Sequence, residues 1–249
     1  MNKFIIKPEP DERINFICFP YAGGYSSTYM QWQKLLSEKV RVCPVALSGR
    51  DIGHDTLREL NYDVMVTRMI KDILPQLEGC VYAIFGHSLG AWLSWSLALE
   101  GECNGNPPLC LIVSGQQSPY SIYPYADVSK VDNKELYTFL KDSGGMDNID
   151  YLDPEIKESF INMIRKDIML CESHVPCSYD VKINIPVYVF GAKDDKLIAS
   201  EYVDEWRIGT TSDATFYWFD GGHFYLNKNK EKILDIINNI LLKYISRRN

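Results

Sequence analysis

Apolar residues recur along this chain in two different patterns, which predict strands and helices in alternation. Short runs rich in β-branched and aromatic residues are typical of buried strands, whereas apolar residues three or four positions apart indicate helices that pack one face against a core. The strand-like runs lie at 13–19, 40–47, 80–85, 109–114, 185–191 and 214–219. The helical segments lie at 26–36, 62–77, 91–100, 200–206 and 229–244. This alternation predicts an α/β fold, with a mostly parallel central sheet flanked by helices.

The alternation stops between residues 115 and 180, where the sequence has no convincing strand pattern. Helices are predicted there at 133–141 and 153–171, and the second has an apolar face that needs a partner. Because this segment interrupts the sheet above the strand ends, we predict that residues 116–179 form a mobile helical lid within a single domain that spans residues 1–249. The alternative is a set of packing helices with no gating role.

Composition narrows the possible partners and the cellular compartment. The formal charge of −7 and the pI near 5.2 argue against a nucleic-acid partner. The first 13 residues hold no apolar run long enough for a signal peptide or a membrane span, so we expect a cytoplasmic protein without a membrane segment. The seven cysteines form no C-x-x-C pair and are expected to be reduced thiols, and neither they nor the four histidines have the spacing of metal ligands. We therefore expect no metal.

A G-x-S-x-G motif lies between the predicted strand at 80–85 and the helix that follows it. In that context the motif is typical of a sharp turn that holds a nucleophilic serine, here Ser88, above the end of the sheet. The helix that follows points its amino terminus at the same place, so the backbone N–H of Leu89 can stabilise an oxyanion. The alternative is an ordinary glycine-rich connection, because the motif alone arises often by chance.

An acid and a histidine follow Ser88 in the order that a serine hydrolase of the α/β-hydrolase class requires. Asp194 and Asp195 come directly after the predicted strand at 185–191, and His223 follows the last predicted strand. The carboxyl ends of parallel strands share one edge of the sheet, so these groups are expected to gather there. His223 is predicted to be the general base, with the aspartate orienting its ring. His87 should point away from Ser88 and play a structural part.

Several motifs together resemble those of the type II thioesterases of nonribosomal peptide and polyketide synthesis. They are Phe19-Pro-Tyr-Ala-Gly-Gly24, Gly86-His-Ser-Leu-Gly90, Ser114-Gly115, Met163-Ile-Arg-Lys-Asp167 and Asp220-Gly-Gly-His-Phe-Tyr-Leu226. The resemblance runs in order over nearly the full chain. It implies an α/β-hydrolase fold and a stand-alone enzyme that hydrolyses acyl thioesters on the phosphopantetheine arm of carrier proteins, clearing misprimed or stalled groups through an acyl-enzyme.

The resemblance also implies roles for individual residues. Carried over by position, Ser88 is the nucleophile, His223 is the base, and the backbone amides of Ala22 and Leu89 form the oxyanion hole. The enzyme would need no cofactor of its own, because phosphopantetheine is carried by the partner. The implied partners are acyl- or peptidyl-carrier protein domains, and we expect a monomer.

The acid of the triad is open between two neighbours. A G-x-x-D count from Gly191 selects Asp194, whereas an alignment to the family without a gap selects Asp195, with Ala192 in place of a usual glycine. We adopt Asp195. Other activities on the same fold also remain open at this stage: a lipase or esterase, an acyltransferase, or a binding module without catalysis.

Overall fold

The computed structural model describes residues 8–47, 60–144 and 153–246. In these ranges six parallel strands form one sheet in the order β2-β1-β3-β4-β5-β6. The strands are β1 Ile14–Phe19, β2 Val40–Pro44, β3 Tyr82–His87, β4 Leu111–Ser114, β5 Val187–Ala192 and β6 Ala214–Phe219. The predicted α/β fold with a mostly parallel sheet is confirmed.

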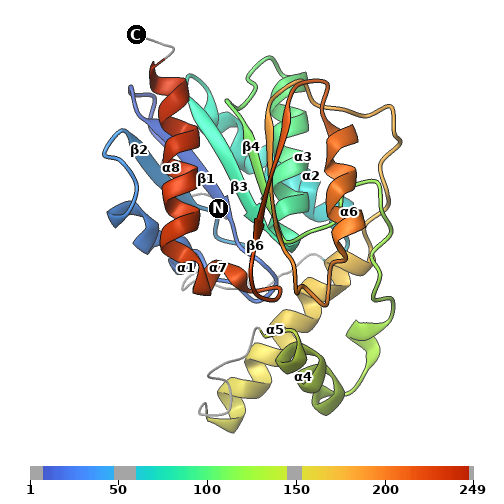
Figure 1. Cartoon of the computed structure of the whole chain (residues 1–249). Coiled ribbons are helices and arrows are strands. Elements are labelled where there is room, and N and C mark those ends of the chain that lie inside the picture. Colours follow the sequence, from blue (N-terminus) through green and yellow to red (C-terminus); the bar gives the residue numbers. More distant parts are fainter. Residues whose placement is uncertain (1–7, 48–59, 145–152, 247–249) are drawn as a thin grey trace.

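Helices cover both faces of this sheet, as Figure 1 shows. One face carries α2 Tyr62–Ile73, α3 Leu89–Cys103 and α6 Ser200–Asp204, and the other carries α1 Ser27–Met30 and α8 Lys230–Ser246. Side chains alternate across the pleat, so β1 sends Ile17 and Phe19 into one core and Phe16 and Cys18 into the other. Burial on both faces explains why the central strands are continuous apolar runs.

Some helix ends differ from the prediction, and 3₁₀ turns account for the differences. The helix predicted at 62–77 ends at Ile73 and continues as the 3₁₀ turn Leu74–Leu77, because Pro75 has no backbone N–H to donate. The helix predicted at 26–36 is interrupted, because α1 is one turn long and is followed by the 3₁₀ turn Gln31–Lys34. Of its apolar residues, Tyr29, Trp32 and Leu36 are buried, whereas Met30 and Leu35 are exposed.

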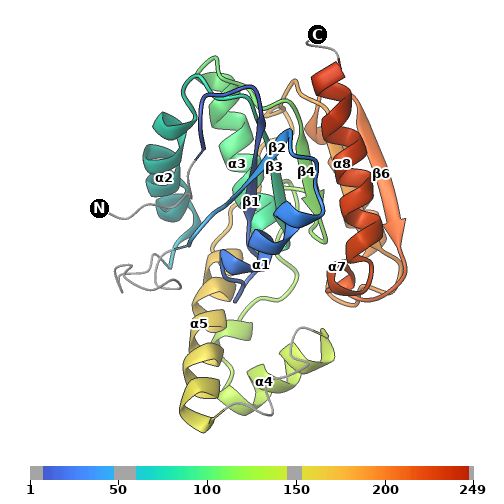
Figure 2. The same cartoon turned by 90° about the vertical axis from the view of Figure 1, so that its left-hand side faces the viewer.

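The segment between β4 and β5 is helical in its described parts. It contains the 3₁₀ turn Val128–Lys130, α4 Asn133–Asp142 and α5 Pro154–Glu172, while residues 145–152 lie outside the described ranges. Figures 1 and 2 show α4 and α5 below the carboxyl ends of the strands. The two helices pack on each other through a small apolar cluster that includes Leu136, Ile161 and Ile164. The mobility of this segment stays a prediction.

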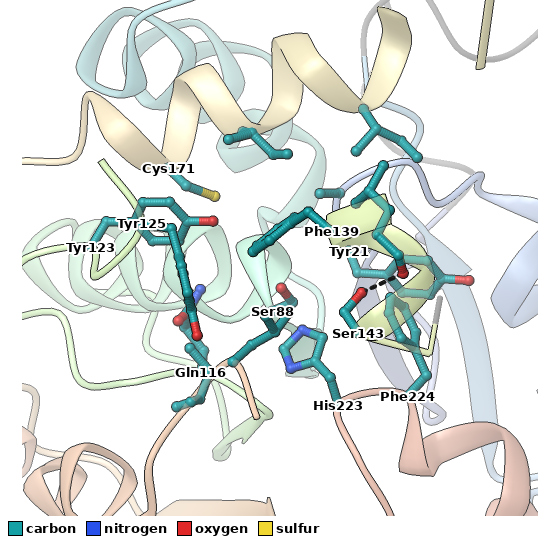
Figure 3. A pocket seen from close by; sticks show the side chains of 16 residues that line it. Tyr21, Ser88, Gln116, Tyr123, Tyr125, Phe139, Ser143, Cys171, His223 and Phe224 are labelled. Carbon is teal, nitrogen blue, oxygen red and sulfur yellow. Dashed lines mark hydrogen bonds between the residues drawn. The ribbon is translucent and has the colours of Figure 1, made fainter. Parts of the chain in front are cut away.

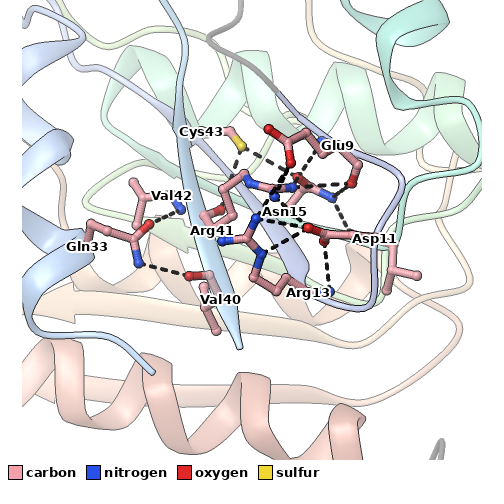
Figure 4. A network of polar contacts seen from close by, with 10 residues as sticks. Glu9, Asp11, Arg13, Asn15, Gln33, Val40, Arg41, Val42 and Cys43 are labelled. Carbon is pink, nitrogen blue, oxygen red and sulfur yellow. Dashed lines mark hydrogen bonds and ion pairs between the residues drawn. The ribbon is translucent and has the colours of Figure 1, made fainter. Parts of the chain in front are cut away.

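A buried arginine, Arg41, forms a polar network near the amino-terminal ends of β1 and β2, at the edge of the sheet opposite the carboxyl ends (Figure 4). Asn15 pairs in register with Arg41, whose guanidinium donates to Asn15 at 3.2 Å, to Asp11 at 2.5 Å and to Glu9. Arg13 adds a second ion pair to Asp11 at 2.9 Å. A buried charge is tolerated when it is paired in this way, so we assign the network a structural part, away from the strand ends that carry the site.

Candidate active site

Ser88 occupies a strained turn between β3 and α3. Its backbone has φ 53° and ψ −125°, a combination that side-chain-bearing residues rarely adopt. The turn is tight on both sides: a Cβ on Gly86 would lie 2.0 Å from the carbonyl oxygen of Gly90, and a Cβ on Gly90 would lie 2.4 Å from that of Phe19. Only glycine fits at either position. The turn therefore holds Ser88 at the amino terminus of α3, as a nucleophile elbow requires.

His87 is fully buried, and its side chain bonds to the core residue Ser114. Its Nδ1 lies 2.9 Å from the Ser114 hydroxyl, which in turn lies 2.6 Å from the Tyr225 hydroxyl. Burial lowers the pKa of His87 well below its usual value, so the ring is neutral near pH 7. A Cβ on Gly115 would lie 2.5 Å from this ring. The network packs behind His223, whose ring centroid lies 5.1 Å from that of His87.

His223 forms a buried pair with Asp195. The His223 Nδ1 lies 2.9 Å from Asp195 Oδ2, and the two side chains are only 4% and 2% exposed. The other carboxylate oxygen accepts the backbone N–H groups of Leu197 at 2.8 Å and Ile198 at 3.1 Å. These two bonds lock the carboxylate in place. With Nδ1 turned to the acid, Nε2 is the nitrogen left to accept a proton from a serine.

Asp194 lies outside this pair. Its carboxylate is exposed and accepts the backbone N–H of Gly221 at 3.3 Å, across the turn that follows β6. The backbone N–H of Asp194 also donates to the Gly221 carbonyl at 3.2 Å. Of the two acids that the sequence left open, the structure therefore pairs Asp195 with His223.

The loop after β1 brings Ala22 to the same cavity as Ser88. The Gly24 N–H donates to the Tyr21 carbonyl at 2.8 Å, which closes a turn with Gly23 at φ 79°. A glycine at the third position allows the positive φ of such a turn. Ala22 and Ser88 both line the cavity, so this loop can supply the predicted second amide of an oxyanion hole.

Asp167 on α5 binds the loop that follows β1. The sequence alone assigns this residue no role. Asp167 lies on α5, is 2% exposed, and accepts the Gly23 N–H at 2.7 Å. Ile164, one turn earlier, packs so closely that a Cβ on Gly23 would lie 2.6 Å from it. Helix α5 therefore buttresses the loop that carries Ala22. The sequence feature that could have indicated this role is an acidic residue on the apolar face of a helix. An acidic side chain is costly to bury unless it is hydrogen-bonded.

Replacing Asp167 with alanine should lower kcat by about 10- to 100-fold with little change in KM, because a displaced oxyanion donor weakens binding of the transition state more than of the substrate. Steady-state kinetics of thioester cleavage would measure both constants. Ser173→Ala is the matched control: Ser173 also lies at the end of α5 and accepts the Tyr62 N–H at 2.8 Å, but it does not touch the loop. Equal kcat values for the two variants would remove the positioning role.

The cavity beside Ser88 and His223 lies between the sheet and the helices α4 and α5 (Figure 3). Its walls are largely apolar, with Phe139 and Leu140 from α4 and Ile164 from α5. Among the described residues that line it, there is no Asp, Glu, Lys or Arg side chain. Such a cavity suits an uncharged, apolar group that is bonded to the serine.

Other sequence expectations concern features outside the cavity. All seven cysteines lie in the described ranges and are free thiols, most of them buried, in agreement with the prediction. Within residues 8–47, 60–144 and 153–246, no three or more His, Cys, Asp or Glu side chains are grouped as metal ligands. Over the same ranges, no helix combines the length and hydrophobicity needed to cross a bilayer.

Comparison with known proteins gives consistent matches over nearly the whole chain. A family model described as "Thioesterase domain" matches residues 15–241. The gramicidin S biosynthesis protein GrsT of Aneurinibacillus migulanus is 25% identical over 241 residues, which cover 95% of this chain and 93% of that protein.

Two solved structures are similar to this one over almost their full length. The RedJ thioesterase from the prodiginine pathway of Streptomyces coelicolor has a TM-score of 0.85 and 28% identity, covering 93% of this chain and 92% of its own. The type II thioesterase BorB from the borrelidin biosynthetic cluster has a TM-score of 0.83 and 25% identity, covering 97% and 99%. The fold shared with these structures is the predicted α/β-hydrolase fold.

Proposed function

This chain belongs to the thioesterase family and hydrolyses acyl thioesters as a serine hydrolase, and from that premise we propose that it removes misprimed or stalled acyl groups from the phosphopantetheine arm of carrier-protein domains. The names of its relatives support this substrate class, since they refer to the biosynthesis of gramicidin S, prodiginine and borrelidin. The observation that carries the proposal is that His223, whose ring is paired with the buried Asp195, lines the same cavity as Ser88.

In the proposed mechanism, His223 takes the proton of Ser88 as the serine oxygen attacks the thioester carbonyl. The negative charge on the carbonyl oxygen is stabilised by the backbone N–H groups of Ala22 and Leu89. Collapse of this intermediate breaks the carbon–sulfur bond, and His223 gives its proton to the departing thiolate. An acyl group is then bonded to Ser88. Asp195 stabilises the imidazolium and keeps Nε2 directed at the reaction.

Water completes the cycle by the same route. His223 removes a proton from a water molecule, which attacks the acyl-enzyme carbonyl and forms a second oxyanion in the same hole. The Ser88–acyl bond breaks, Ser88 recovers its proton from His223, and the free acid leaves. In this proposal the enzyme acts as a monomer in the cytoplasm and needs no cofactor or metal of its own, because the carrier protein supplies the phosphopantetheine.

The proposal predicts that carrier-bound thioesters are cleaved far better than free esters of the same acyl group. Several carrier-protein domains loaded with different acyl groups would be weighed by mass spectrometry before and after incubation with the enzyme, and the mass should fall by that of the acyl group. Free fatty esters are the comparison for an esterase. Added alcohols or amines are the comparison for an acyltransferase, which would form an ester or amide. Cleavage of free esters alone, with intact acyl-carriers, would overturn the proposal.

A further inference from the structure

Gln116 lines the cavity beside Ser88, and its side-chain amide donates no hydrogen bond to the described residues. The residue follows Gly115 at the end of β4, is 2% exposed, and lines the cavity. Its Oε1 accepts the backbone N–H of Gln117 at 3.1 Å. Because that neighbour is a donor, the oxygen and not the nitrogen of the side chain must face it, which fixes the orientation of the amide. The structure gives the Nε2 group no hydrogen-bond acceptor among the described residues.

The segment that carries this amide is held on several sides. The Gln116 carbonyl accepts the indole N–H of Trp206 at 2.9 Å, and the Gln117 carbonyl accepts that of Trp92 at 3.0 Å. The Gln117 side chain donates to the Ile122 carbonyl at 2.6 Å. A donor on such a segment is already in place before a ligand arrives, so little entropy is lost when it forms a hydrogen bond.

The surroundings of the amide favour a neutral acceptor. Figure 3 shows Gln116 with Tyr123 and Tyr125 on one side of Ser88, and Tyr21 on the other. The Tyr125 hydroxyl donates to the Lys196 carbonyl at 2.9 Å, so that donor is already used. A carboxylate would find no Lys or Arg side chain among the described residues of the cavity wall, and its desolvation would be costly. A carbonyl oxygen would satisfy the amide without that cost.

We propose that the Gln116 Nε2 group donates a hydrogen bond to a carbonyl oxygen of the bound thioester other than the one under attack, and thereby contributes to substrate selection. The oxygen is that of an amide or a ketone, located either in the pantetheine arm or in the acyl group. This inference rests on the proposed function, because it takes the occupant of the cavity to be an acyl thioester.

Three thioesters distinguish the two sources of the carbonyl oxygen, the pantetheine arm and the acyl group. The first is an unsubstituted alkanoyl ester of ethanethiol, which has no second carbonyl. The second is the same alkanoyl group on pantetheine, which adds the amides of the arm, and the third is a 3-oxoalkanoyl ester of ethanethiol, which adds a ketone. For Gln116→Met, of similar length but without the amide, kcat/KM should fall about tenfold on the second or third substrate and remain near wild type on the first.

Gln116→Glu is the second variant, because it keeps an oxygen for the Gln117 N–H and replaces the donor with a carboxylate oxygen. Its effect is measured as kcat/KM on the second or third substrate relative to kcat/KM on the first, since the added charge acts on all three. This variant should show the same selective loss. A loss confined to the pantetheine ester assigns the bond to the arm, and a loss confined to the 3-oxoalkanoyl ester assigns it to the acyl group. In each sample the simple ester reports whether the fold and catalytic groups are intact.

Equal effects on all three thioesters, or no effect on any, would overturn the role of Gln116. That result is separate from failure of the proposed function, in which the wild-type enzyme itself would leave acyl-carrier proteins intact.

Discussion

Replacing Ser88 with alanine should abolish thioester hydrolysis and leave the fold in place. The serine side chain makes no capping bond to α3, so its loss removes no contact that holds the helix. Alanine at φ 53° has nearly the same backbone cost as serine, since both carry a Cβ. Loss of a nucleophile of this kind typically costs about 10³- to 10⁶-fold in kcat. The measurement is the rate of pantetheine release from an acyl-pantetheine substrate, followed with a thiol-reactive reagent.

Ser94→Ala offers a matched control for Ser88→Ala. Ser94 lies in the same helix, is fully buried, and its hydroxyl donates to the Ala91 carbonyl at 2.7 Å. This control should keep near wild-type turnover, and thermal unfolding should show both variants folded. If Ser88→Ala retained more than roughly a tenth of the wild-type rate, the nucleophile would have to be another group.

The second large effect is expected from Asp195→Asn. The new amide oxygen would keep the bonds to the backbone N–H groups of Leu197 and Ile198, so the amide nitrogen would face His223. Two donors cannot share one hydrogen bond, and His223 would shift its proton from Nδ1 to Nε2. In that tautomer the ring cannot take the proton of Ser88. A comparable change in a serine protease costs about 10⁴-fold in kcat.

Asp194→Asn is the control for this change, at the adjacent position and with the same chemistry. Its side chain would still accept the Gly221 N–H through its amide oxygen, so kcat should stay within about threefold of wild type. Both variants would be assayed on one acyl-pantetheine substrate under single-turnover conditions. If Asp194→Asn proved the more damaging, the acid would act through a rearrangement that this structure does not contain.

The hydrogen bond between Asp167 and Gly23 restricts how the helical segment between β4 and β5 can move. A lid that moved as one body would break this bond each time it opened and release the loop that carries Ala22. Ser173 holds the same end of α5 to the start of α2. Opening of the cavity is therefore expected to involve α4 more than the carboxyl-terminal half of α5.

The sequence by itself determined the α/β architecture and the strand-to-helix turn that holds the predicted nucleophile. Alternating apolar runs and amphipathic segments predict a parallel sheet because burial on both faces requires them. The elbow could be predicted because its motif is local: the steric limit at Gly86 is set by the backbone of Gly90 in the same turn, although the limit at Gly90 is set by Phe19 at the end of β1. The order of serine, acid and histidine at strand ends is likewise a property of the chain.

Tertiary structure decided which neighbouring residues take part in the site. Asp194 and Asp195 are adjacent residues of the same type. The backbone N–H groups of Leu197 and Ile198 hold Asp195, and the turn after β6 supplies its His223 partner and the Gly221 N–H that Asp194 accepts. The bond from Asp167 to Gly23 joins positions 144 residues apart. Hydrophobic spacing reports which face of an element is buried, but the direction of a side chain in a loop depends on partners that reach it from elsewhere in the fold.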